Sequence, residues 1–254
     1  MTRFRGLRHL VFRLRYGFRG VPVRVAGHSF RLDETLRRLK LSNEAGLQEV
    51  LCSTLRPGDS VFDIGANLGL HTLLAARLVG AGGSVWAFEP VPANLRLLRR
   101  NLELNDLLGW VHVVPKAVSN SPSPFLDMAI ASGSAETDPT ASICTHGVGE
   151  ASIQVKNVRL DELSLPSEKA LRLVKVDVEG AELEVLRGGE QLLQRTQPLL
   201  IIEVHGDGLQ KLGGSIEDLN AFLERLGYRQ RLLEGPSFNM GYYQAVFERR
   251  LCAR

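Results

Sequence analysis

Short apolar runs alternate with longer amphipathic segments along most of this chain. From residue 60 onward the apolar runs have the length of strands, and the segments between them carry apolar side chains at helical spacing. Strands are expected at residues 60–64, 84–88, 111–114, 171–176, 198–204, 228–233 and 242–248, and helices at 68–79, 92–104, 182–193 and 216–226. Strands that alternate with helices at this spacing predict an α/β fold with a doubly wound, mostly parallel sheet.

Two regions depart from this rhythm. Residues 119–160 start with a Ser/Pro cluster, have strand-like patterns at 125–130 and 151–160, and carry a polar stretch of small residues between them. Long irregular loops in compact domains are usually functional or disordered, so we expect a β-hairpin insertion with a long mobile tip. The other region is residues 1–55, where we expect a basic N-terminal extension with a helical cap over 33–55, ahead of the main domain at 56–254.

The N-terminal extension is unusually basic. Its first 32 residues contain eight arginines and no acidic residue, whereas the whole chain has a formal net charge of only +3. Because apolar side chains alternate with these arginines, one interpretation is that residues 1–20 make peripheral contact with an anionic membrane surface. The other is that the apolar side chains pack on the domain. The arginines also interrupt any apolar core of a signal peptide.

Composition narrows the class of protein further. The chain has ordinary globular composition, with 44% hydrophobic and 23% charged residues. No apolar run is long enough to span a membrane as a helix. Three widely spaced cysteines without a C-x-x-C motif exclude a disulfide scaffold and a Cys-rich zinc site. A cytoplasmic protein, associated with a membrane at most peripherally, is expected.

The segment with the most chemical information is residues 61–69, where a buried strand ends and a helix begins. In doubly wound folds, ligands bind at the carboxyl ends of the strands, beside the point where the strand order reverses. Gly65 would let the chain turn tightly and let a ligand approach the backbone. Asn67 tolerates a left-handed conformation, and Gly69 would let the helix pack close to the sheet.

This turn differs from known phosphate-binding turns. A dinucleotide fingerprint would need further glycines where Asn67 and Leu70 stand, and the Lys-Ser/Thr of a P-loop is missing. The carboxylate of Asp63 would repel a pyrophosphate and attract a cation, which suits S-adenosylmethionine. Glu89, at the end of the second strand, is expected to accept hydrogen bonds from ribose hydroxyls. The simpler interpretations are that Asp63 caps the helix and that Glu89 is a surface acid.

Several motifs in sequence order resemble those of the FkbM family of methyltransferases. They are DIGANLG at 63–69, FEP at 88–90, LDEL at 160–163, KVDVEGAE at 175–182, VLRGG at 185–189 and EVH at 203–205. The resemblance implies a class I Rossmann-like fold with a seven-stranded sheet, S-adenosylmethionine as methyl donor and, usually, O-methyl transfer. It does not identify the acceptor. The cofactor-binding residues expected on this basis are Asp63, Gly65, Ala66, Asn67, Gly69, Glu89, Pro90, Asn94, Ala117 and Asp177.

Four residues at the ends of the fourth and fifth strands are the candidates for catalysis. Lys175 and Asp177 share one face of the fourth strand, and a buried lysine needs a partner such as Asp177 or Asp63, so a purely structural ion pair is the alternative. Glu203 and His205 share a face of the fifth strand. Transfer to an alcohol needs a base or a metal, and His205 has the most suitable intrinsic pKa. Asp177 and Glu203 could hold the hydroxyl, orient the imidazole or bind a divalent cation, although no metal is expected.

Other residues and other functions are less favoured. Glu182 is assigned only to the favourable start of a helix, and His71 to packing. No aromatic platform follows Asp177, so a nucleic-acid substrate is not expected, and the acceptor is expected to be a small molecule or a glycan. A nicotinamide-dependent oxidoreductase and a non-catalytic adenosyl-binding module remain as alternatives.

Overall fold

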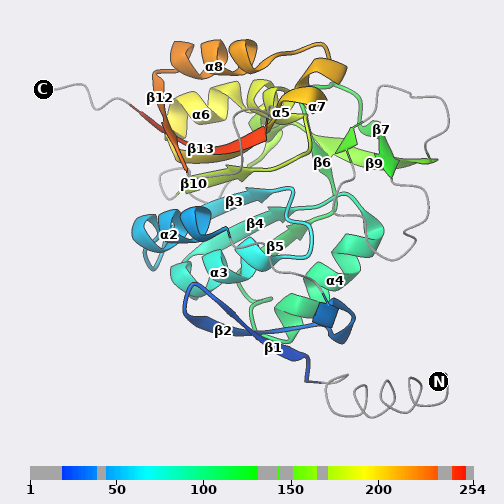
Figure 1. Cartoon of the computed structure of the whole chain (residues 1–254), viewed down its shortest axis with the longest axis vertical. Coiled ribbons are helices and arrows are strands. Elements are labelled where there is room, and N and C mark those ends of the chain that lie inside the picture. The colour runs from blue at the N-terminus through cyan, green and yellow to red at the C-terminus, as the bar shows by residue number, and fades with distance from the viewer. Residues whose placement is uncertain are drawn as a thin grey trace, which may run out of the picture.

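The centre of the molecule is a twisted sheet of seven strands in the order β12-β13-β11-β10-β3-β4-β5 (Figure 1). The computed structural model describes residues 19–38, 44–130, 142–143, 151–164, 171–233 and 242–249. All neighbouring strands from β5 to β11 are parallel, and only β13 runs in the opposite direction within this sheet. The predicted mostly parallel seven-stranded sheet is therefore confirmed. The strands are β3 (Ser60–Ile64), β4 (Ser84–Phe88), β5 (Val111–Val114), β10 (Leu171–Val176), β11 (Leu199–His205), β12 (Tyr228–Leu232) and β13 (Tyr242–Arg249).

Helices cover both faces of this sheet. One face packs against α2 (Ala45–Thr54), α3 (Leu70–Val79) and α4 (Pro92–Glu103), and the other against α5 (Glu182–Gly188), α6 (Glu190–Thr196) and α8 (Ile216–Arg225) (Figure 1). A short helix, α7 (Gly206–Lys211), follows β11 directly. Because successive strand residues point to opposite faces, Val61 is buried in one apolar cluster and Phe62 in the other. This arrangement explains why the strands are apolar along nearly their whole length.

The N-terminal extension contains a β-hairpin that the sequence-based prediction lacks. Strands β1 (Val21–Val25) and β2 (His28–Leu32) pair antiparallel, and η1 (Glu34–Arg38) and α2 follow as the predicted helical part. The turn at Ala26 and Gly27 has φ angles of 47° and 80°, as two-residue hairpin turns require. Alternation of apolar and polar residues on both sides of this turn is the signal that identifies the hairpin.

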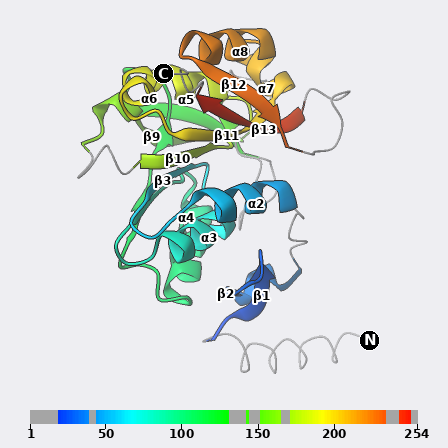
Figure 2. The same ribbon diagram turned by 90° about the vertical axis from the view of Figure 1, so that its left-hand side faces the viewer.

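The β1–β2 hairpin of the extension packs against helices, whereas α2 of the same extension lies on one face of the sheet. Phe30 and Leu32 are buried in the cluster that α3 and α4 share, and Asn101 of α4 accepts a hydrogen bond from the backbone of Asp33 at 2.8 Å. Figure 2 shows the hairpin on the same side of the sheet as α2, α3 and α4. The basic segment at residues 1–18 lies outside the described residues, so its predicted contact with a membrane stays a prediction. Among the described residues, no helix is long and apolar enough to cross a membrane.

The predicted hairpin insertion is present and forms a second sheet beside the first (Figure 1). Its strands are β6 (Ala117–Val118), β7 (Phe125–Ile130), β8 (Ser142–Ile143) and β9 (Ala151–Val158), followed by the short helix η2 (Leu160–Glu162). Strands β7 and β9 pair antiparallel, with Phe125 opposite Lys156. Most of the predicted mobile tip, residues 131–141 and 144–150, lies outside the described residues.

Candidate functional site

A cavity that is open to solvent lies at the carboxyl ends of β3, β4 and β10. Its position is the one expected for a ligand in a doubly wound sheet. The insertion contributes to the wall through Met128. The full lining is Ile64, Gly65, Asn67, Phe88, Glu89, Pro90, Val91, Asn94, Lys116, Ala117, Val118, Met128, Asp177, Val178 and Glu179.

The glycine turn after β3 has the left-handed backbone that the sequence predicts, and its glycines also make room for neighbouring segments of the chain. Asn67 has φ 50°. A Cβ on Gly65 would lie 1.8 Å from the carbonyl oxygen of Asp177, so the missing side chain admits the chain after β10. Gly65 has φ 77°, as a tight turn requires, and it also lines the cavity. A Cβ on Gly69 would lie 2.4 Å from Leu98 Cδ1, so Gly69 lets α3 approach α4. The expectation that Gly69 lets the helix pack close to the sheet is corrected in this way.

Glu89 is buried at the cavity wall and is not a surface acid. Its Oε2 accepts a hydrogen bond from the backbone of Asn67 at 2.8 Å, and its Oε1 accepts from the backbone of Val91 at 2.9 Å and from Asn94 Nδ2 at 3.4 Å. Only 4% of Glu89 is exposed, and burial raises its pKa to about 7 despite these hydrogen bonds. A carboxylate can accept about four hydrogen bonds, so it retains capacity for a ligand hydroxyl.

Asp63 lies behind the cavity, where it holds a buried lysine. Its Oδ2 accepts a hydrogen bond from Thr72 Oγ1 at 2.5 Å, and its Oδ1 lies 3.4 Å from Lys175 Nζ. It is 2% exposed and is absent from the cavity lining, so the expected direct attraction of a bound cation is not supported. The alternative interpretation is wrong too, because Gly69 occupies the N-cap position of α3 and no side chain caps that helix.

Lys175 joins the two acids that the sequence offered as partners. Its Nζ lies 3.2 Å from Asp177 Oδ2, and it donates a hydrogen bond to the carbonyl oxygen of Gly65 at 3.4 Å. Burial lowers the pKa of Lys175, but the charges of Asp177, Asp63 and Glu203 outweigh burial and bring the pKa above its usual value. Lys175 is therefore a fixed cation. Because Asp177 also lines the cavity, its carboxylate connects the buried ion pair with the ligand space.

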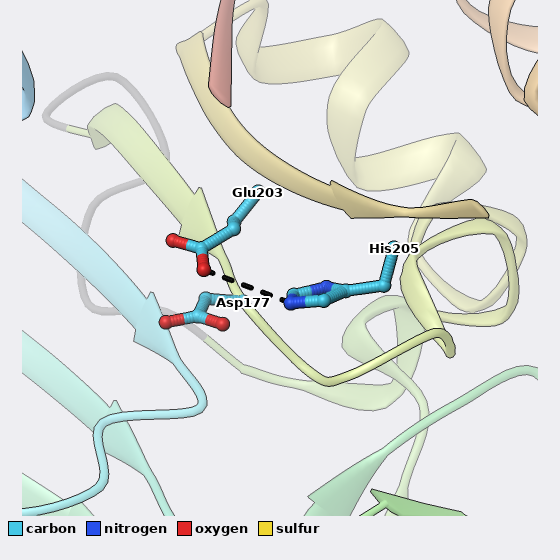
Figure 3. A group of neighbouring side chains, drawn as sticks. All are labelled: Asp177, Glu203 and His205. Carbon is cyan, nitrogen blue, oxygen red and sulfur yellow. Dashed lines mark ion pairs between the residues drawn. The ribbon is translucent and has the colours of Figure 1, made fainter. Parts of the chain in front are cut away.

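Asp177, Glu203 and His205 point toward one another from the ends of β10 and β11 (Figure 3). His205 Nε2 lies 3.6 Å from Glu203 Oε1 and 3.4 Å from Glu179 Oε2, and its Nδ1 lies 2.9 Å from Glu182 Oε1. Burial lowers the pKa of His205, but the hydrogen bond and the charge of Glu182, followed by the charges of Glu179 and Asp177, raise it to about 9. The sequence thus placed three of its catalytic candidates correctly relative to one another.

The antiparallel strand β13 completes this cluster. Tyr242 pairs with His205 across the two strands, and Gln244 pairs with Glu203. The Tyr242 hydroxyl donates to Glu203 Oε1 at 2.5 Å, and Gln244 Nε2 donates to Glu203 Oε2 at 2.7 Å. The Tyr242 and His205 rings lie 5.1 Å apart. Burial and the charge of Asp177 raise the pKa of Glu203 above its usual value, although these two hydrogen bonds act in the opposite direction.

The spacing of these three side chains would also suit a divalent cation, because one ligand atom from each lies within 4.8 Å of the others. Donors already surround the two carboxylates. Lys175 contacts Asp177, and Tyr242 and Gln244 occupy both oxygens of Glu203. The cluster therefore has its own positive charge and its own hydrogen-bond donors, and we retain the expectation that the site works without a metal.

Sequence reasoning missed two contacts of this region. Glu182 was assigned only to a helix start, yet it is fully buried against His205. His71 was assigned to packing, yet its Nε2 lies 2.5 Å from Glu44 Oε2. Seven of the expected cofactor-binding residues line the cavity: Gly65, Asn67, Glu89, Pro90, Asn94, Ala117 and Asp177. Asp63, Ala66 and Gly69 do not, and the backbone N–H of Ala66 donates to the carbonyl oxygen of Phe88.

Comparisons with known proteins give a family match and individual relatives that cover most of the chain. The model of the methyltransferase FkbM domain matches residues 63–230. Hexuronic acid methyltransferase AglP of Haloferax volcanii is 31% identical over 188 residues, which cover 71% of this chain and 72% of that protein. The 31-O-demethyl-FK506 methyltransferase FkbM of Streptomyces tacrolimicus is 29% identical over 209 residues, covering 72% of this chain and 78% of that protein.

Solved structures share the fold at low sequence identity. A ribosomal protein L11 methylase from Lactobacillus delbrueckii subsp. bulgaricus has a TM-score of 0.51 at 13% identity, covering 87% of this chain and 85% of its own. A Streptococcus mutans protein in complex with SAH has a TM-score of 0.50 at 13% identity, covering 83% of this chain and 99% of its own. These two structures show that the architecture is that of class I methyltransferases.

The two acids on Lys175 are expected to differ in their effect on stability. Asp63→Asn removes a charge from a pair that is dry on both sides, so the free energy of unfolding should fall by about 3–5 kcal/mol. Asp177→Asn should cost about 1 kcal/mol, because the Asp177 side chain is 26% exposed and water screens its charge. Urea denaturation of both variants measures the difference. Equal losses would contradict the placement of Asp63 as the deeper partner.

Proposed function

Because this chain belongs to the FkbM family of methyltransferases, we propose that it methylates a hydroxyl group of a small molecule or glycan. It is an enzyme of the S-adenosylmethionine-dependent class, and the oxidoreductase alternative is not supported. The observation that carries the proposal is the cavity itself. Glu89, an acceptor for a cofactor hydroxyl, lines one part of it, and Asp177, which belongs to the cluster around His205, lines another.

The residues of the cavity fit S-adenosylmethionine. Glu89 has spare acceptor capacity for the ribose, the side chain of Asn94 lies beside it, and Ala117 lines the same cavity. Asp177 presents a carboxylate to the same space, and we propose that it takes the role expected of Asp63 in attracting the positive part of the donor. When bound, the donor supplies a methyl group on a sulfonium that is already a good electrophile. Alignment of the acceptor is then the main task of the protein.

His205 is the proposed base for the acceptor hydroxyl. The hydroxyl proton has to leave as the oxygen–methyl bond forms, and His205 Nε2 is the nitrogen that faces Glu203 and Glu179. Since the pKa of His205 is about 9, the ring is protonated at neutral pH and accepts the proton only after losing its own. Glu203 and Asp177 are placed to hold the hydroxyl beside the ring.

The names of the relatives support a sugar or small-molecule acceptor, and one of the two names supports a hydroxyl. One relative is called a hexuronic acid methyltransferase, a name that does not specify the methylated group, and the other acts, by its name, on 31-O-demethyl-FK506. In this chain the proposed acceptor side carries Asp177, Glu179 and Glu203 close together. A neutral polyhydroxylated acceptor fits these carboxyl groups better than an acidic one, because a further negative charge would be repelled.

Glu89→Gln tests the cofactor side. Loss of a charged hydrogen-bond acceptor should weaken binding of S-adenosylhomocysteine by about tenfold to a hundredfold at pH 8. In the wild type, affinity should rise by up to about tenfold from pH 6 to pH 8, because only the ionised carboxylate keeps its full acceptor capacity and its pKa is about 7. In the variant this rise should disappear. Calorimetry at several pH values decides, and unchanged affinity at pH 8 would remove Glu89 from the binding site.

His205→Gln tests the acceptor side. We expect methyl transfer from labelled S-adenosylmethionine to a panel of neutral sugars and hydroxylated macrocycles to fall by about a hundredfold or more. Donor affinity should stay within a few-fold of the wild type. His112→Gln, an exposed histidine of β5, is the matched control and should keep full activity. A His205→Gln variant with normal turnover would refute the proposed base, and absence of transfer by the wild type to every acceptor would favour a non-catalytic adenosyl-binding protein.

Removal of divalent metal is expected to leave turnover unchanged, because Lys175 already contacts Asp177 and hydrogen-bond donors already occupy both oxygens of Glu203. The measurement is the transfer rate after dialysis against a strong chelator, followed by addition of Mg²⁺ or Mn²⁺. Activity that is lost on chelation and restored by one of these ions would contradict this prediction.

A further inference from the structure

Glu182 is a fully buried carboxylate for which the proposed reaction has no direct use. Its Oε1 accepts a hydrogen bond from the backbone of Gly180 at 2.8 Å and lies 2.9 Å from His205 Nδ1. Its Oε2 is buried without a hydrogen-bond partner among the described residues. A carboxylate in such surroundings is unfavourable unless a specific partner compensates for the lost water. The partner with a matching charge is the imidazole of His205.

The geometry decides which nitrogen of His205 is available. A carboxylate oxygen only accepts hydrogen bonds, so the contact with Glu182 requires the proton on Nδ1. The other nitrogen, Nε2, lies 3.4 Å from Glu179, which lines the cavity, and 3.6 Å from Glu203. The neutral ring therefore has its lone pair on Nε2, where an acceptor hydroxyl would lie.

We propose that Glu182 is the positioning residue for His205, holding Nδ1–H so that Nε2 is the nitrogen that takes the proton of the acceptor hydroxyl. The inference rests on the proposed function of His205 as base. Glu182 itself does not touch the reacting atoms. It acts through the orientation and the tautomer of the ring.

A contact between two glycines places Glu182 beneath His205. Gly180 precedes α5 with φ 111°, and a Cβ on it would lie 2.4 Å from Gly208 Cα. Conversely, a Cβ on Gly208 would lie 2.6 Å from Gly180 Cα. Gly208 belongs to α7, which begins directly after His205. The chain that leads into Glu182 and the helix that follows His205 therefore touch at their backbones, and this contact sets the distance between the two side chains.

The charge of Glu182 also has a measurable consequence. The charged and titratable groups around the ring come from β10, β11, β13 and the chain between β10 and α5. They are Lys175 in β10, Asp177 and Glu179 after it, Glu182 at the start of α5, Glu203 in β11 and Tyr242 in β13. Burial lowers the pKa of His205, and Glu182 is the largest of the influences that raise it. Without the charge of Glu182 the protonated ring is less favoured, so the base form is present at lower pH.

The test is the pH profile of kcat for Glu182→Gln. In the wild type, kcat should rise with pH to half of its plateau near pH 9, the pKa of His205. In the variant the midpoint should move to lower pH by one unit or more, and the plateau should fall about tenfold because the ring is no longer held. KM for the donor should change less than threefold. Glu182→Asp keeps the charge and should retain a midpoint near that of the wild type.

Glu184→Gln is the matched control. It lies on the same helix, is partly exposed and pairs with Arg187, so neither its midpoint nor its plateau should differ from the wild type. A Glu182→Gln variant that keeps the wild-type midpoint, in a protein whose His205→Gln variant is inactive, would overturn the role of Glu182 and leave the proposed function standing. Normal activity of His205→Gln would instead refute the base.

A second measurement does not depend on any variant that has to fold. Nitrogen-15 NMR of labelled wild-type protein above pH 10 reports the tautomer of the His205 ring. The Nδ1–H form is expected, because the carboxylate of Glu182 accepts from that nitrogen. A predominant Nε2–H form would overturn the proposal.

Discussion

One buried ammonium group, that of Lys175, holds the ligand-binding end of the sheet together. It lies between Asp63 at the end of β3 and Asp177 after β10, and it donates to the carbonyl oxygen of Gly65 in the turn between β3 and α3. Two carboxylates so close to each other in a dry interior would repel strongly without a cation between them. The charges of both acids compensate for the loss of water around the buried Lys175. Its contact with Asp177 holds that carboxylate in a fixed orientation at the wall of the cavity.

Close backbone contacts at glycines fix the positions of the loops around this ion pair relative to one another. Gly65 admits the carbonyl oxygen of Asp177, and Gly180 and Gly208 pack against each other. The first contact ties the turn after β3 to the end of β10, and the second ties the end of β10 to the helix after β11. The distances between Lys175, Asp177 and His205 thus depend on three positions that tolerate no side chain.

The periodicity of the sequence predicted the main sheet and its helices because strands buried on both faces are apolar along their length and helices are amphipathic. The N-terminal hairpin at Val21–Val25 and His28–Leu32 also has alternating apolar and polar residues, so the sequence contains the signal for it as well. Whether a side chain at a strand end is buried or faces the cavity was harder to predict. Asp63 stands at a strand end, as expected, but whether a carboxylate at that place faces the ligand or the neighbouring strand depends on the twist of the sheet, which no local pattern encodes.

The pairing between strands that are distant in the sequence is the second feature that could not be predicted. Tyr242 contacts His205 because β13 pairs antiparallel with β11, and this pairing joins residues about 40 positions apart. In the sequence, Glu182 looks like an ordinary acidic residue at the start of a helix. Its contact with His205 arises only because the chain before α5 meets α7 at Gly180 and Gly208. The motif residues could therefore be named from the sequence, but the groups that orient them could not.

The charges around the cavity suggest how one site can favour binding of the methyl donor and release of its demethylated product. Asp177, Glu179 and Glu203 outnumber the nearby cations Lys175 and His205. Such a surplus of carboxyl groups attracts a positively charged donor more strongly than its neutral thioether product, because the difference in Coulomb energy is largest where little water screens it. Glu182 contributes most to raising the pKa of His205 to about 9, and Glu179 and Asp177 add to its effect. Two of the carboxyl groups proposed to attract the donor therefore also make the proposed base stronger, while reducing the fraction of His205 that is free of its proton at neutral pH.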